Sequence, residues 1–183
     1  MNKFDIVKGA DAEVRRDIAG WEDKADDYVA EFFDNDVERV YGTRFGDNLA
    51  IIASIAENAL IAPETFRGVR DKEGRLQAGA IVHQESDCLE VNDLATAPWN
   101  ILLHQPESLK GAGTSLMEAL VKESIDLGKG GRLKVYAIPR ARQFYINIGF
   151  LETDGGEMEL TPEAALGFLE EQRQFRERGG DSR

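Results

Sequence analysis

The sequence predicts an α+β (mixed α/β) domain, in which helices flank a mostly antiparallel sheet that contains one parallel strand pair. Two observations predict this fold class. Strand-like segments at 65–70, 76–84 and 88–96 follow one another across short polar turns, which is typical of an antiparallel meander. A periodic apolar segment, 114–127, then separates 88–96 from the strand candidate 133–138, and such a helical crossover makes the two strands parallel.

The chain is expected to form one domain that spans 1–183. Its 183 residues are enough for a full hydrophobic core, and no low-complexity tract divides them. The core of the domain is expected at 65–160. A helical part at 10–62 is expected before this core, and a C-terminal helix at 161–178 after it.

A first strand at Phe4–Lys8 and a long amphipathic helix are expected near the N-terminus. Asp11 is the expected N-cap of this helix, and Gly20 is expected to kink or break it. Apolar residues recur at helical spacing in the segment, namely Val14, Ile18, Trp21, Ala25, Tyr28 and Phe32. The stripe faces the core or a partner, so this helix and the C-terminal helix could also mediate homodimerisation.

A second helix and a closing hairpin complete the expected elements. Residues 34–46 predict a polar loop with a short helical turn, and Asp47 is expected to cap a helix at 49–61. The remaining expected elements are a short helix between Pro139 and Gly149, a hairpin at 150–160, a final helix capped by Thr161, and a disordered tail at 179–183.

The charge balance excludes some classes of partner. Lys and Arg number 22 against 34 Asp and Glu, which gives a net charge of −12. Such a chain is repelled by nucleic acids and by anionic membrane surfaces, so neither is expected as a partner. The same charge is compatible with a cationic, amine-bearing substrate, although many proteins are acidic without such a ligand.

The sequence predicts a cytoplasmic protein. No run approaches the roughly 18 apolar residues that a membrane-spanning helix needs. The segment that begins at Met1 has no apolar signal core and is expected to be mature protein. The single cysteine, Cys88, cannot form an internal disulfide and is expected to be a small core residue.

A glycine-containing turn lies between the strand at 88–96 and the helix at 114–127. Glycines at 111 and 113 would let main-chain N–H groups press against a ligand, and the helix that follows adds unpaired N–H groups. A phosphate or pyrophosphate is therefore the expected ligand, with positive charge from Lys110, Arg140 and Arg142. An ordinary strand–turn–helix junction remains an equally good interpretation of the turn alone.

Two common phosphate-binding loops are excluded at this turn. The lysine of a P-loop follows its glycines, whereas Lys110 precedes Gly111 and Gly113. The dinucleotide-binding pattern requires a third glycine where this chain has Leu116.

The turn at 108–113 and the segment at 138–150 resemble the GNAT superfamily of N-acetyltransferases. The pyrophosphate signature of that family, Gln/Arg-x-x-Gly-x-Gly/Ala, corresponds to residues 108–113, Ser-Leu-Lys-Gly-Ala-Gly. The later family signature, Asn-x-x-Ala-x-x-x-Tyr-x-x-x-Gly-Phe, is matched at Ala141, Tyr145, Gly149 and Phe150. The resemblance covers residues 65–160.

The sequence departs from the family pattern at two positions. Ser108 stands where Gln or Arg is usual, which removes one side-chain contact to phosphate, and Ile138 stands where Asn often contacts the pantetheine arm.

The resemblance implies that acetyl-CoA binds where the strands at 88–96 and 133–138 diverge. It places the pyrophosphate on main-chain amides of Lys110, Gly111, Ala112, Gly113, Thr114 and Ser115. It places pantetheine along the main chain of Leu94, Ala95 and Thr96. The same main chain would polarise the thioester carbonyl while a neutral amine attacks directly, so no enzyme nucleophile is needed.

The resemblance also implies that Tyr145 protonates the departing thiolate. From spacing alone, the preferred interpretation of Tyr145 is the aromatic residue of an amphipathic helix. With the resemblance, the acid is preferred, and Phe144 and Ile148 then serve as the core anchors that leave Tyr145 at the edge of the cleft. Glu90 and Asp93 are the candidate bases, with bulk water as an alternative, and strand alternation predicts that they face opposite sides of the sheet. Either carboxylate could instead be solvated or capping.

No metal is expected, because His83, His104 and Cys88 do not form a ligand set; His104 is a weak candidate for substrate contact. The expected function is acetyl-CoA-dependent transfer of an acetyl group to the primary amine of a small molecule or peptide. Two alternatives remain open. One is an acyl-CoA-binding module that has lost catalysis, and the other is an unrelated nucleotide-binding domain.

Overall fold

The computed structural model describes residues 3–102 and 104–179. These residues form a seven-stranded sheet with the order β1-β2-β3-β4-β5-β7-β6. β4 and β5 are parallel, and the other neighbours are antiparallel. The strands are β1 Asp5–Lys8, β2 Phe66–Arg70, β3 Leu76–Gln84, β4 Leu89–Thr96, β5 Leu133–Tyr136, β6 Leu151–Glu152 and β7 Glu157–Leu160. The predicted fold class is therefore confirmed.

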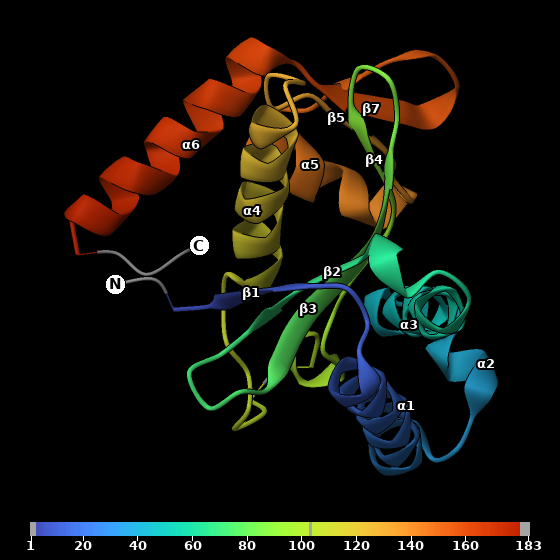
Figure 1. The fold of residues 1–183 in the computed structure, drawn as a ribbon. Coiled ribbons are helices and arrows are strands. Elements are labelled where there is room, and N and C mark those ends of the chain that lie inside the picture. The colour runs from blue at the N-terminus through green and yellow to red at the C-terminus, as the bar shows by residue number, and fades with distance from the viewer. Residues whose placement is uncertain (1–2, 103, 180–183) are drawn as a thin grey trace.

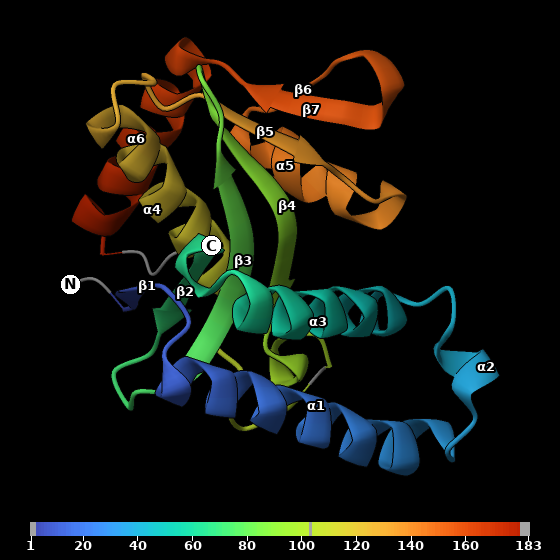
Figure 2. The same cartoon turned by 45° about the vertical axis from the view of Figure 1, so that its right-hand side comes forward.

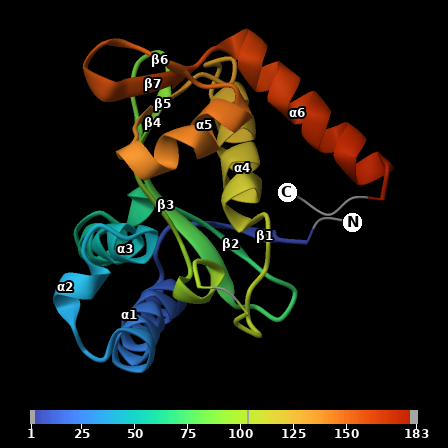
Figure 3. The ribbon, with the colours of Figure 1, turned by 180° about the vertical axis from the view of Figure 1, so that it is seen from behind.

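Helices cover both faces of the sheet (Figure 1). One face carries α1 Ala12–Phe33 and α3 Arg44–Ile61, with the short α2 Val37–Val40 between them. The other carries α4 Ala112–Asp126, α5 Arg142–Ile148 and α6 Pro162–Glu177, as the view from behind shows (Figure 3). Within residues 3–102 and 104–179, none of the helices has the length and hydropathy of a membrane span.

A core lies on each side of the sheet. On the α4 side, β3 contributes Ala78, Ala80 and Val82 to a cluster that also includes side chains of α4, α5 and α6. On the α1 and α3 side, the alternate residue Ile81 packs with Trp21 and other apolar residues. β3 is thus buried on both faces from Leu76 to Val82, which explains why residues 78–82 form a continuous apolar run rather than an alternating pattern.

The strands β4 and β5 separate part of the way along β4 (Figure 2). Their register pairs Leu89 with Leu133 and Val91 with Val135, and no pair follows Val91. β4 nevertheless continues to Thr96, so the main chain from 92 to 96 has an edge with no strand beside it. This open edge is where the family resemblance places the cofactor.

Because of a β-bulge in β4, the prediction that Glu90 and Asp93 lie on opposite faces of the sheet is wrong. Ile81 pairs with Asp93 and Val82 pairs with Val91, so Asn92 has no partner in β3. The extra residue shifts the alternation, and Glu90 and Asp93 lie on the same face rather than on opposite faces.

The structure also corrects details of the helices. α1 runs through Gly20 without a break, because Ile18 and Trp21 on either side of it are both packed in the core. α3 is capped by Thr43, whose hydroxyl accepts from the Gly46 N–H, so Asp47 lies inside the first turn rather than at the cap. α4 begins at Ala112, two residues before the expected start. The predicted tail beyond residue 179 lies outside the described residues.

Candidate functional site

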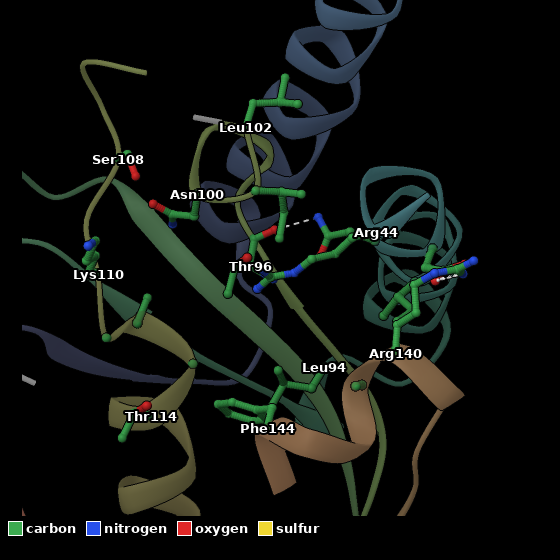
Figure 4. A pocket seen from close by; sticks show the side chains of 18 of the residues that line it. Arg44, Leu94, Thr96, Asn100, Leu102, Ser108, Lys110, Thr114, Arg140 and Phe144 are labelled. Atoms are coloured by element: carbon green, nitrogen blue, oxygen red, sulfur yellow. Dashed lines mark hydrogen bonds and ion pairs between the residues drawn. The ribbon is translucent and has the colours of Figure 1, made fainter. Parts of the chain in front are cut away.

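A cavity of about 860 Å³ opens where β4 separates from β5. Figure 4 shows side chains from β4, α3, α5 and the segment before α4 around this space. The predicted site residues Leu94, Thr96, Tyr145 and those from Lys110 to Thr114 all line it. Residues of four separate sequence regions therefore meet in one cavity.

The N-terminus of α4 faces the cavity without a side-chain cap. Gly111 is the N-cap residue, with φ +93°, a left-handed conformation that side chains other than glycine's adopt only with strain. The other long helices begin under the capping side chains of Asp11, Thr43 and Thr161. The N–H groups of Ala112 and Gly113, which no bond within the helix satisfies, can therefore donate to an anion.

The second glycine of the turn lies beside α5. A Cβ at Gly113 would lie 3.4 Å from the ring of Phe144, which is an ordinary van der Waals contact, so this position has room for a methyl group. The first turn of α4 and Phe144 of α5 border the cavity together.

A buried polar network holds the segment that precedes α4. Asn100 accepts a hydrogen bond from the Leu109 N–H (2.8 Å) and donates to Gln77 Oε1 (2.9 Å). The fully buried Gln77 in turn donates to Asp71 Oδ2 (2.8 Å). Burial alone would raise the pKa of Asp71, but hydrogen bonds from Arg75 and Gln77 outweigh it and lower that pKa. The network connects the β2–β3 turn to the residue next to Lys110.

Three main-chain positions at the end of β4, Leu94, Ala95 and Thr96, were expected to bind pantetheine, and one of them can bind a ligand in the structure. The Ala97 N–H bonds to the Gln77 carbonyl of β3, and alternation in an antiparallel pair then directs Ala95 to β3 and Leu94 and Thr96 to the open edge. Both main-chain groups of Thr96 are bonded to the side chain of Asn48 on α3, which donates to the Thr96 carbonyl (2.9 Å) and accepts from the Thr96 N–H (3.3 Å). The Leu94 main chain therefore remains for a ligand.

Tyr145 is more deeply buried than the sequence suggested. It is 4% exposed, and its ring packs edge-on against Phe144 and Phe150. Burial, and secondarily the charge of Asp93, raises the pKa of Tyr145, so its phenol is protonated at neutral pH. Phe144, the expected core anchor, is half-buried and lines the cavity beside it.

The two candidate bases are not among the residues that line the cavity. Asp93 accepts a hydrogen bond from the Ser54 hydroxyl of α3 (2.9 Å), which fixes its carboxylate on the α3 side of the sheet. Glu90 pairs across the sheet with His83 and Lys134, on the segment where β4 and β5 are still joined.

Two other predicted residues also lie away from the cavity lining. Arg142 forms an ion pair with Glu152 of β6 (3.0 Å), and Ser115 is buried in the first turn of α4. Arg140 lines the cavity instead, where its guanidinium pairs with Asp47 (2.7 Å). His104 also lines it, whereas Cys88 is buried in the core, as predicted.

The contribution of α3 to the cavity was not predicted from the sequence. Arg44, Asp47, Asn48 and Ile51 all line the cavity from its first two turns. The sequence contains one weak signal, because Asn48 is a polar residue at a core position of the apolar helical pattern. In the structure its side chain is buried, with 6% exposed. Among the described residues, no cluster of three histidines, cysteines or carboxylates could hold a metal ion.

No protein-family model and no curated protein sequence matches this chain. Solved structures do match it. A GNAT-family acetyltransferase from Listeria monocytogenes aligns with TM-score 0.52 and 13% identity, over 85% of this chain and 92% of that chain. A GNAT-family acetyltransferase from Staphylococcus aureus aligns with TM-score 0.51 and 11% identity, over 85% of this chain and 97% of that chain.

A third structure was determined with coenzyme A bound. N-acetylglutamate synthase from Neisseria gonorrhoeae, complexed with coenzyme A and N-acetylglutamate, aligns with TM-score 0.50 and 15% identity, over 98% of this chain and 33% of that chain. At such identities the likeness establishes the fold alone. The chain has the GNAT fold.

Proposed function

From the GNAT fold of this chain and the geometry of its cleft, we propose that it is an acetyl-CoA-dependent N-acetyltransferase. It would move an acetyl group to a primary amine by direct attack in a ternary complex. The observation that carries the proposal is the uncapped N-terminus of α4, which begins at Gly111 in left-handed conformation and opens into the cavity between β4 and β5. The structural neighbours with acetyltransferase names support the same activity.

The residues present fit coenzyme A. A diphosphate at the first turn of α4 would accept hydrogen bonds from main-chain N–H groups and gain from the helix dipole. Lys110 adds a cation at the cavity wall, which compensates in part for Ser108 at the position of a polar phosphate ligand. The Leu94 main chain, at the open edge of β4, offers a donor and an acceptor to the amide groups of the pantetheine arm.

The proposed reaction needs no covalent intermediate on the enzyme. The neutral amine attacks the thioester carbonyl, a C–N bond forms, and the C–S bond breaks as the tetrahedral intermediate collapses. An N–H donor at the open edge, such as that of Leu94, would stabilise the charge on the carbonyl oxygen. Tyr145, kept protonated by its raised pKa, would give its proton to the leaving thiolate. The attacking nitrogen loses a proton as the amide forms, and return of that proton through water would restore the phenol of Tyr145.

The proton of the substrate ammonium must leave before attack. Asp93 is the better supported of the two carboxylates, because its charge acts on Tyr145 and Ser54 fixes its position. Since neither Asp93 nor Glu90 lines the cavity, we propose transfer through water, with bulk solvent as the final acceptor.

The test is release of coenzyme A from acetyl-CoA across a panel of small-molecule and peptide amines, after calorimetry has established that coenzyme A binds. Tyr145→Phe should lower kcat by roughly 100-fold and leave the acetyl-CoA KM unchanged. Tyr136→Phe is the matched control, because Tyr136 is exposed on β5 and does not line the cavity. Binding of coenzyme A without turnover of any amine would select the non-catalytic module instead.

A further inference from the structure

The cavity carries a charge opposite to that of the whole chain. Three cations, Arg44, Lys110 and Arg140, line it together with one carboxylate, Asp47. Asp47 is already paired with Arg140 at 2.7 Å, so it does not offset the other two cations. A protein with net charge −12 has therefore placed an excess of positive charge in this cleft.

Arg44 is the cation that the proposed cofactor leaves unexplained. Its side chain points into the cavity from the first turn of α3, with Thr96 of β4 between it and the Lys110 wall (Figure 4). Among the described residues, no acidic side chain or hydrogen-bond acceptor pairs with its guanidinium. The diphosphate proposed at the α4 N-terminus lies on the Lys110 side, so Arg44 is available to a second anion.

The backbone beneath Arg44 is held rigidly for such a role. Thr43 caps the helix immediately before it, and Asn48, one turn later, is anchored to both main-chain groups of Thr96. The guanidinium therefore extends from a fixed base into a cavity where an incoming acceptor must lie. A planar guanidinium can bind a carboxylate through two parallel hydrogen bonds.

We propose that the acetyl acceptor is an amine that also carries a carboxylate, as in an amino acid or a peptide, and that Arg44 binds this carboxylate. The proposal rests on the acetyltransferase function argued above. The unpaired cation also disfavours a second ammonium in the cleft, which argues against polyamines. It favours the neutral form of the attacking amine as well, because a nearby positive charge opposes its protonation.

The anion could have one other source, the 3′-phosphate of coenzyme A. The two sources differ in what loss of Arg44 would do. If Arg44 binds the acceptor, Arg44→Gln leaves the Kd of coenzyme A unchanged. If Arg44 binds the 3′-phosphate, the same substitution weakens coenzyme A but not dephospho-coenzyme A, and the proposal is overturned.

The experiment compares L-amino acids with the amines that remain when the carboxylate is removed. In the wild type, kcat/KM should be at least about tenfold higher for the carboxylated member of each pair. Arg44→Gln should abolish this preference by raising the acceptor KM, and Arg44→Lys should restore part of it. Arg39→Gln is the control, because Arg39 pairs with exposed Asp34 outside the cavity. Equal or better use of the decarboxylated amines by the wild type would overturn the proposal.

A binding measurement separates this inference from the proposed activity. N-acetyl amino acids are titrated into protein saturated with coenzyme A, for the wild type and for Arg44→Gln. If no amine is acetylated, the proposed function fails, yet tighter binding to the wild type than to the variant would still support the anion site. Equal binding to both, or no binding to the wild type, would overturn it.

Discussion

The two walls of the cleft are built from different materials. The α4 wall is formed by one continuous stretch, residues 108–114, and its key feature is the main chain at the left-handed Gly111. The α3 wall is made of side chains: Arg44, Asp47 and Asn48 come from α3, and Arg140, which pairs with Asp47, comes from the turn before α5. Main-chain N–H groups stay in place when side chains are substituted, so the α4 wall can bind one constant cofactor. Side chains change with each substitution, so the α3 wall can be varied to suit an acceptor.

The side-chain wall should make the larger contribution to folding. Asn48→Ala removes both hydrogen bonds to Thr96 and leaves its main-chain groups unpaired. We expect the free energy of unfolding, measured in urea, to fall by about 2 kcal/mol. Asn58→Ala on the same helix is the control, because the bonds of Asn58 stay within α3, and it should cost less than about 1 kcal/mol. Equal losses in the two variants would mean that the anchor to β4 has no special weight.

The main-chain wall should make the larger contribution to cofactor binding. Gly111→Ala forces a Cβ into a left-handed conformation at the start of α4 and should raise the Kd of coenzyme A at least about tenfold. Gly128→Ala at the other end of the same helix carries the same backbone strain at φ +77°, with open space around it. It should lower stability similarly while leaving the Kd unchanged, and weakened binding in both variants would point to general destabilisation.

The buried polar network of Asp71, Gln77 and Asn100 behind the main-chain wall should make a smaller, pH-dependent contribution to the free energy of unfolding. The folded pKa of Asp71 is lowered, so its contribution to stability is present above the ordinary carboxyl pKa of about 4 and is lost as pH falls through the folded value. Asp71→Asn should therefore be less stable than wild type by about 1 kcal/mol at pH 7. The gap should narrow in unfolding curves below pH of about 4. A gap that does not change with pH would show that the charge of Asp71 is irrelevant.

The order of the elements was predictable because each left a local signal. Apolar periodicity and turn residues located the meander, the crossover and the closing hairpin, and the glycines located the α4 wall. β1 was predicted as a strand, but its place beside β2 at the edge of the sheet depends on long-range pairing.

The parts that could not be predicted depend on contacts between distant residues. The bulge at Asn92 reverses the alternation that separates Glu90 from Asp93, and it appears only in the register with β3. The sequence offers both Arg140 and Arg142 as cations for the phosphate. Only the structure shows that Arg140 lies at the cleft beside Asp47, whereas Arg142 pairs with Glu152 away from it. The α3 wall left no motif at all, since its side chains matter only because α3 packs beside the end of β4.

The central claim is that the first turn of α4 binds the diphosphate of coenzyme A through its main chain. The most direct test is an NMR titration of ¹⁵N-labelled protein with coenzyme A, in which the amide signals of the first α4 turn are followed. The account predicts that the Ala112 and Gly113 amides shift more than the rest of the helix and saturate together with binding. Binding of coenzyme A that leaves these two amides unmoved would contradict it.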